Sequence, residues 1–234
     1  MNIAIIPARG GSKRIPKKNI RRFFGKPLIG YSIDVAKQSG VFDEIIVSTD
    51  DAEIAAYAKE CGALVPFVRP ESLSDDMTGT RPVTNHAIEW AQLNLGSLDF
   101  ACCIYATAPF LQTQYLQQGL QALKDSPDKG FAYSVTSFAF PIQRALLLKE
   151  NYAYPAFEKD IYKRSQDLPE AFHDAGQFYW GTVDAYLSSK PIFSEHGIPV
   201  ILPRHLVQDI DTQEDWDRAE LMYKAYSLQQ RGSH

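Results

Sequence analysis

Cysteine is scarce in this sequence. The three cysteines, Cys61, Cys102 and Cys103, are too few for a disulfide framework and do not have zinc-site spacing. The five histidines show no metal-ligand spacing either. Cys102 and Cys103 lie in an apolar run, so we expect them to be core thiols of a protein that works in the reducing cytoplasm. The cysteine content therefore excludes a disulfide-stabilised secreted domain and a zinc protein.

Long hydrophobic runs and an excess of basic charge are also missing. No apolar stretch approaches the roughly 20 residues of a membrane-spanning helix, and no signal peptide opens the chain. The net charge of -4 speaks against nucleic acid as a partner, because nucleic acid requires a basic face. The glycine spacings of the Walker loop and of the dinucleotide fingerprint are absent as well. We therefore expect neither a membrane nor a nucleic-acid partner.

A basic, glycine-containing loop does follow a short apolar run. Residues 3–6 predict a buried strand, and residues 7–19 read PARGGSKRIPKKN. Glycines let backbone N–H groups approach an anion closely, and Arg and Lys neutralise phosphate charge. Open α/β sheets bind ligands beyond the carboxyl ends of their strands, where this loop begins. A solvated basic turn is the alternative, but the preceding strand and an aspartate pair described below favour a triphosphate site.

Predicted strands and helices alternate along the chain. The strands are 3–6, 44–48, 63–67, 99–105 and 131–137, and the helices are 27–38, 52–61, 82–95 and 112–124. Such alternation with short connections predicts an α/β fold with a doubly wound, mostly parallel sheet. With 45% hydrophobic residues, we expect one domain over residues 1–228. Residues 231–234 resemble the start of an engineered histidine tag.

The alternation breaks between residues 138 and 172. This segment is rich in tyrosine, proline and charge and has no helical period, which predicts a hairpin-like excursion from the sheet. We expect it to pack on a second subunit, which makes the protein a homodimer. Strands at 176–181 and 198–202 and a closing helix at 212–225 follow, and Thr212 and Asp215 form a capping-box variant for that helix.

Asp209 and Asp211 are separated by one residue. Alternate residues of an extended segment point the same way, so both carboxylates can face one ligand. Two carboxylates at so short a distance repel each other unless a cation lies between them. Mg²⁺ accepts one or two carboxylates as ligands beside substrate phosphates. The alternative is that both residues flank a helix N-terminus. Together with the phosphate loop, the pair favours a magnesium site.

The motifs together resemble one family. They are P-A-R-G-G-S-K-R-I-P-x-K-N, R-P-x-x-L-x-x-D, Thr-Ala-Pro after the fourth strand, R-x-Q-D-L-P and D-I-D. Over residues 3 to about 221 the chain resembles the nonulosonic acid cytidylyltransferases, which include the CMP-sialic acid synthetases. Where the sialic acid enzymes read Gln-Pro-Thr-Ser-Pro, this chain has Tyr105-Ala-Thr-Ala-Pro, and Asp174-Ala-Gly replaces Asn-Gly. Both differences resemble the pseudaminic acid branch.

The resemblance implies a site for CTP, an acidic nine-carbon sugar and Mg²⁺. The implied nucleotide-binding residues are Ala8, Arg9, Gly10, Gly11, Ser12, Lys18, Asn19, Arg69 and Thr80. Ala8 would read the cytosine through its backbone, and Arg9 and Lys18 would also act in catalysis. Tyr105 would contact the sugar, and Arg164 would reach the sugar bound by the partner protomer. Asp209 and Asp211 would be catalytic metal ligands.

The implied reaction transfers CMP from CTP to the anomeric hydroxyl of a nonulosonic acid, pseudaminic acid in this branch, and releases pyrophosphate. A synthetase for CMP-N-acetylneuraminate or another CMP-sugar acid is the nearest alternative. A pyrophosphorylase that acts on a sugar 1-phosphate is another. An inert CTP-binding regulatory subunit is a non-enzyme alternative, which the aspartate pair argues against because binding alone needs no paired metal carboxylates.

Overall fold

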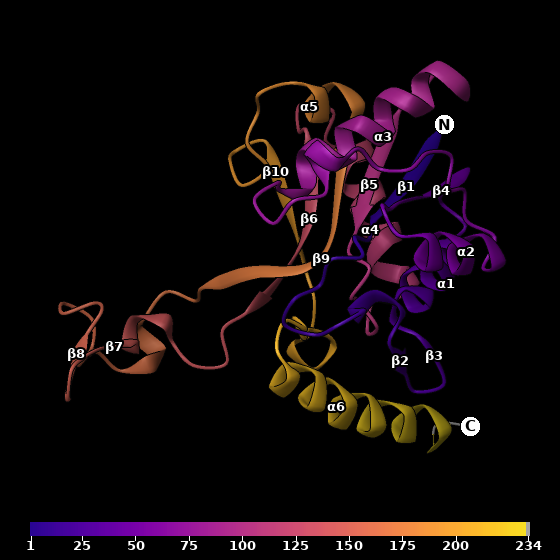
Figure 1. The fold of residues 1–234 in the computed structure, drawn as a ribbon. Helices are drawn as coiled ribbons and strands as arrows, with labels where there is room; N and C mark the ends of the chain where they lie inside the picture. Colours follow the sequence, from indigo (N-terminus) through magenta and orange to yellow (C-terminus); the bar gives the residue numbers. More distant parts are fainter. Residues whose placement is uncertain (233–234) are drawn as a thin grey trace.

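A six-stranded sheet with helices on both faces forms the body of the protein (Figure 1). The computed structural model describes residues 1–232. The strand order is β10-β6-β9-β5-β1-β4, and β9 is antiparallel to both of its neighbours while the other pairs are parallel. The strands are β1 Asn2–Pro7, β4 Glu44–Ser48, β5 Phe100–Ile104, β6 Phe131–Ser137, β9 Phe172–Thr182 and β10 Gly197–Ile201. The predicted mostly parallel α/β sheet is therefore confirmed.

Alternate residues of β1 divide the core between the two faces of the sheet. Ala4 and Ile6 pack in a cluster with residues of α1, α2, α4 and α6, whereas Ile3 and Ile5 pack with α3 and α5. The helices are α1 Leu28–Ser39, α2 Ala52–Glu60, α3 Thr80–Asn94, α4 Thr113–Asp125, α5 Val183–Leu187 and α6 Gln213–Gly232. None of the helices described within residues 1–232 is long and apolar enough to cross a membrane.

Local sequence signals place several of these elements correctly. Asp51 caps α2, since its Oδ1 accepts hydrogen bonds from the backbone N–H groups of Glu53 at 2.8 Å and Ile54 at 3.0 Å. At α6, the backbone N–H of Thr212 donates to Asp215 Oδ2 at 2.8 Å, and the N–H of Asp215 donates back to Thr212 Oγ1 at 3.2 Å. This reciprocal pair is the predicted capping box.

The cysteines of β5 are core thiols. Cys102 and Cys103 are buried in β5, as expected, and burial raises the pKa of the Cys103 thiol to about 12.

At the C-terminal end of the chain, α6 continues through residues 231 and 232 of the expected tag remnant, and residues 233 and 234 lie outside the described part.

One predicted strand is wrong. Residues 63–67 form no strand, and only Leu64 makes a single parallel bridge, with Ile46 of β4. The Leu64 N–H donates to Ile45 O at 2.8 Å and its carbonyl accepts from the Val47 N–H at 2.8 Å. Pro66 follows two residues later and has no N–H to donate, so the ladder cannot continue.

The excursion is an arm that projects from the body (Figure 1). It contains the antiparallel hairpin of β7 Leu146–Lys149 and β8 Tyr152–Pro155, which confirms the hairpin prediction. The chain returns from the arm directly into β9, so β9 runs antiparallel to β6. β9 begins at Phe172, earlier than predicted, because its first residues pair with β6 near the base of the arm.

Short elements complete the fold. Arg22–Phe23 (β2) and Lys26–Pro27 (β3) form a two-stranded ribbon before α1. Single 3-10 turns lie at Lys18–Ile20, Glu71–Leu73, Ile142–Arg144, Ser165–Asp167 and Arg204–Leu206. The first two of these turns belong to the segments that surround the cavity described next.

Candidate functional site

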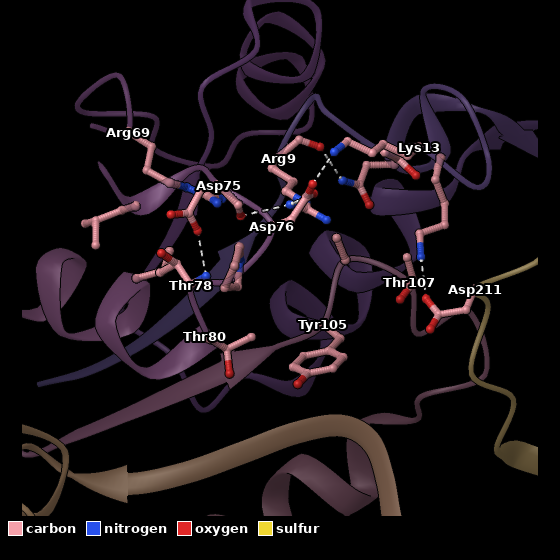
Figure 2. A pocket seen from close by; sticks show the side chains of 18 of the residues that line it. Arg9, Lys13, Arg69, Asp75, Asp76, Thr78, Thr80, Tyr105, Thr107 and Asp211 are labelled. Atoms are coloured by element: carbon pink, nitrogen blue, oxygen red, sulfur yellow. Dashed lines mark hydrogen bonds and ion pairs between the residues drawn. The ribbon is translucent and has the colours of Figure 1, made fainter. Parts of the chain in front are cut away.

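A cavity of about 540 Å³ lies beyond the carboxyl ends of β1 and β5 (Figure 2). Four segments line it: the basic loop after β1, residues 69–80 before and into α3, residues 105–107 after β5, and Asp211 before α6. Parallel strands place their carboxyl ends on one edge of the sheet, which brings these distant segments together. Arg9, Ser12, Lys18, Asn19, Arg69, Thr80, Tyr105 and Asp211 are the sequence-predicted residues that line this cavity.

Asp76 holds two cations of the basic loop. Its Oδ1 lies 2.6 Å from Arg9 Nη1, and its Oδ2 accepts a hydrogen bond from Lys13 Nζ. These hydrogen bonds lower the pKa of Asp76, so its carboxylate is ionised at neutral pH. Arg9 Nη1 also donates to the backbone carbonyl of Asp75 at 2.8 Å.

Asp211 holds two further cations of the loop. Its Oδ2 lies 2.8 Å from Arg14 Nη2, and its Oδ1 lies 3.1 Å from Lys18 Nζ. Lys18 is the most enclosed of these cations, with 17% of its side chain exposed, and it also donates to the Ile210 carbonyl at 2.5 Å. The basic loop is thereby attached to the segment before α6, which lies almost 200 residues further along the chain.

Asp209 differs from Asp211. Apart from the backbone N–H of the adjacent Ile210, its carboxylate has no hydrogen-bond or ion-pair partner among residues 1–232, and it lines a second, neighbouring cavity. Partial desolvation raises the pKa of Asp209, and the charge of Asp211 adds to this effect. The described residues contain no cluster of three or more potential metal ligands. Two carboxylates, one of them without a cationic partner, suit an ion such as Mg²⁺ that takes its remaining ligands from water and substrate phosphates.

Arg69 and Asn19 position the wall of the first cavity. Arg69 is only 5% exposed, and its guanidinium donates to the carbonyl of Ser48 and, at 3.2 Å, to Ser48 Oγ. Burial lowers the pKa of Arg69, and the charge of Asp50 opposes this effect. Asn19 Nδ2 donates to the Arg9 carbonyl at 3.0 Å and so fixes the entry to the loop.

Two small residues of the loop, Ala8 and Gly10, make contacts within the protein. Ala8, Gly10 and Gly11 do not line the cavity. Ala8 is buried, and the Gly10 N–H already donates to Asp50 Oδ1 at 2.9 Å. A Cβ on Gly10 would lie 2.6 Å from Asp51 Oδ2, so glycine is required there for close approach to the start of α2. The side chains of the loop line the cavity, the Gly10 amide is paired with Asp50, and the roles of Ala8, Gly10 and Gly11 in nucleotide binding stay predictions.

The second cavity has a volume of about 870 Å³ and shares Tyr105 with the first. Asp174, Gly176 and Asp209 also line it, together with Arg204, His205 and Arg218. The Tyr105 ring lies 5.4 Å from the ring of Tyr179, whose hydroxyl donates to Asp174 Oδ2 at 2.5 Å. Burial raises the pKa of Tyr105, so its phenol is neutral. Tyr105 is the boundary between the two cavities.

Sequence reasoning missed some lining residues. Lys13 and Arg14 belong to the basic loop, and Asp76 is the last residue of the motif R-P-x-x-L-x-x-D. The loop and the motif could therefore have identified these three residues as candidates. Thr107 belongs to the Thr-Ala-Pro motif but was assigned no role, and Thr78 carried no distinctive signal. Arg164 lines neither of the two cavities, because it lies in the arm, where its Nε is 2.7 Å from Asp167 Oδ2.

Comparisons with known proteins agree with this geometry. The sequence matches the family described as cytidylyltransferase over residues 3–230. It is 49% identical over 224 residues to a pseudaminic acid cytidylyltransferase of Campylobacter jejuni, covering 95% of this chain and 96% of the relative. It is 31% identical to a CMP-N,N'-diacetyllegionaminic acid synthase of Legionella pneumophila, covering 93% and 94%. A CMP:2-keto-3-deoxy-manno-octonic acid synthetase complexed with CTP shares the fold, with a TM-score of 0.70, 17% identity and coverage of 96% and 99%.

Proposed function

Because the chain belongs to the cytidylyltransferase family, we propose that it transfers CMP from CTP to a nonulosonic acid and that the acceptor is pseudaminic acid. The high identity to the Campylobacter enzyme over nearly the whole of both chains supports this acceptor. The reaction releases pyrophosphate and produces the CMP-activated sugar. CTP as the nucleotide accounts for the cationic cavity, since a triphosphate needs several positive partners.

The meeting of the two cavities at Tyr105 is the observation that carries this function. The first cavity contains the cations of the basic loop, and the second has room for a sugar acid. Asp211 lines the first and Asp209 lines the second, so the aspartate pair spans their junction. Two substrates bound side by side at such a junction would meet at the phosphorus that is attacked.

The transfer forms one bond and breaks another. The anomeric oxygen of the sugar acid attacks the α-phosphorus of CTP, loses its proton, and the bond from the α-phosphorus to the bridging oxygen of the pyrophosphate breaks. Arg9 and Lys18 would bind phosphate oxygens and stabilise the charge that develops on them. Arg69, Asn19, Ser12 and Thr80 would position the nucleotide. Holding two anionic substrates in line is the main contribution of the protein.

Mg²⁺ is the proposed cofactor. Asp209 and Asp211 would hold it, since the carboxylate of Asp209, which has no cationic partner, is separated by one residue from the cation-paired carboxylate of Asp211. Bound there, the ion supplies Lewis-acid stabilisation of the phosphate charge. Arg14 and Lys18, which hold Asp211 in the free protein, would then be available to the phosphates.

A pyrophosphate-release assay tests the proposal directly. The protein is incubated with pseudaminic acid and each of CTP, UTP, ATP and GTP, and pyrophosphate is measured. We expect release with CTP alone among the four nucleotides, and none without the sugar acid. Binding of CTP without any release would identify an inert nucleotide-binding subunit. Release only with a sugar 1-phosphate would identify a pyrophosphorylase.

We expect pseudaminic acid to exceed N-acetylneuraminic acid in kcat/KM. The Tyr105 ring at the cavity boundary favours a sugar that presents an apolar methyl end over one with a hydroxylated tail. A hydroxyl that loses water without gaining a partner costs about 1–3 kcal/mol. Steady-state kinetics with both sugars measures the preference. Tyr105→Phe keeps the ring and should keep the preference, whereas Tyr105→Gln should reduce it. Equal or better turnover of N-acetylneuraminic acid by the unaltered protein would refute the assignment of the acceptor.

We propose that the protein works in the cytoplasm as a homodimer and that each arm completes the partner's acceptor site. Large apolar side chains of the arm are uncovered: Phe140 and Leu148 are each 81% exposed and Tyr162 is 94% exposed. Such a surface suits a protein partner. The arm projects from the body (Figure 1), and Arg164, which belongs to the arm, lines neither cavity of its own chain, so we assign Arg164 to the site of another copy. CTP and the free cysteines fit the reducing cytoplasm.

Mixing two inactive variants tests this shared site. Arg164→Ala and Asp211→Asn should each be nearly inactive alone. Mixed dimers should regain activity, because one of their two sites combines an intact Asp211 with an intact Arg164. Light scattering at the assay concentration should give twice the mass of the chain. A fully active monomer, or a mixture no more active than its components, would contradict the shared site.

A further inference from the structure

Asp76 lines the first cavity, where its carboxylate pairs with two of the cations that are proposed to bind phosphate (Figure 2). Both of its carboxylate oxygens are used, one by Arg9 at 2.6 Å and the other by Lys13. Carboxylates and phosphates bind the same Arg and Lys donors through the same kind of charge-assisted hydrogen bond. A triphosphate that binds Arg9 and Lys13 must therefore compete with Asp76. The proposed reaction assigns no role to Asp76.

Among residues 1–232, the hydrogen bonds and ion pairs that join residues 70–78 to the rest of the chain come only from Arg9 and Lys13. Apart from the bonds from Arg9 and Lys13, the hydrogen bonds described for residues 70–78 stay within that segment. Asp75, for example, accepts from the N–H groups of Met77 and Thr78. The Asp76 side chain is 43% exposed. The segment can therefore release Arg9 and Lys13 without breaking any other hydrogen bond to the body.

The two pairs of cations are held by different carboxylates. Lys18 contacts Asp211, next to Asp209 and the acceptor cavity, so the α-phosphorus belongs there. Arg9 and Lys13 contact a separate carboxylate, Asp76, and are left for the phosphates that depart as pyrophosphate.

We propose that Asp76 is an internal competitor of the leaving pyrophosphate. It pairs with Arg9 and Lys13 in the free protein, gives them up when the triphosphate binds, and returns to them as pyrophosphate leaves. Asp76 is thus a positioning residue that keeps the cations in place and weakens product binding. This inference rests on the proposed function, because it takes the ligand to be a triphosphate that is cleaved to pyrophosphate.

The test measures binding of inorganic pyrophosphate, and separately of CTP, by calorimetry in the absence of sugar acid. Exposed ion pairs contribute little individually, so we expect Asp76→Asn and Asp76→Ala to lower both dissociation constants by about three- to tenfold. In the full reaction, KM for CTP should fall, and inhibition by added pyrophosphate should strengthen by the same factor. If release of pyrophosphate limits turnover, kcat should fall together with KM, because the product leaves more slowly.

Glu53→Gln is the matched control. It neutralises a carboxylate that holds another lysine of the same loop, Lys17, at 2.7 Å, and neither residue lines the cavity. We expect pyrophosphate affinity to be unchanged in this variant, which separates competition at the site from a general loss of negative charge.

Unchanged or weaker pyrophosphate binding in both Asp76 variants would overturn the inference. So would an equal gain in Glu53→Gln. Failure of the unaltered protein to bind CTP would instead reject the proposed function, so the two failures are distinguishable.

Discussion

Asp209→Asn should lower kcat by at least about 100-fold at saturating CTP and sugar acid, in line with the loss of one strong electrostatic contribution to a transition state. Asp209 forms no ion pair and no hydrogen bond with another side chain among residues 1–232, so its carboxylate is available to hold a metal ion. Loss of its charge should also raise the Mg²⁺ concentration needed for half-maximal activity. Steady-state kinetics over a Mg²⁺ titration measures both effects.

Asp211→Asn should lower kcat similarly but differ in its effect on CTP. Asp211 holds Arg14 and Lys18, and neutralising it frees both cations for phosphate. Asp211→Asn should therefore bind CTP in the absence of metal at least as tightly as the unaltered protein, whereas Asp209→Asn should not change that affinity. Both residues lie in the segment before α6 with partly exposed side chains, so unfolding temperatures should stay close to the original. Full Mg²⁺-dependent activity in both variants would remove the metal site.

Lys18→Ala should lower kcat/KM for CTP by about 10- to 100-fold, because a charge-assisted hydrogen bond to a phosphate contributes about 1.5–3 kcal/mol. Lys18 is the most enclosed cation of the loop, with a side chain that is 17% exposed, so solvent screens its contacts least. Arg9→Ala should have an effect of the same order. Steady-state kinetics at varied CTP measures both.

Lys17→Ala is the control for the Lys18 experiment. Lys17 is the neighbouring residue, but it pairs with Glu53 and does not line the cavity. Its replacement should leave kcat/KM for CTP within about twofold of the original value, as expected for an exposed ion pair. If Lys18→Ala and Arg9→Ala were as active as Lys17→Ala, the basic loop would be a surface turn rather than a phosphate site.

Much of the framework follows from short-range signals. The apolar run at residues 3–6 and the Asp51 cap depend on neighbours within a few positions, and the strand and the helix were placed correctly from them. The Thr212–Asp215 capping box is equally local. The strand predicted at residues 63–67 was wrong because the prediction followed the apolar composition and did not account for the missing N–H of Pro66. The direction of β9 could not be read from its residues, because direction depends on how the chain returns from the arm.

The same division applies to the site. The family resemblance, the basic loop and the aspartate pair could be identified without the structure, since each depends on short runs of adjacent residues with their own chemistry. Which distant residues meet follows from the fold: Lys18 lies beside Asp211, Arg9 beside Asp76, and Tyr105 between two cavities. The fold also brings Gly10 close to Asp51. Contacts between residues far apart in sequence depend on how strands order in the sheet, and that order is set by packing of the whole core rather than by any local pattern.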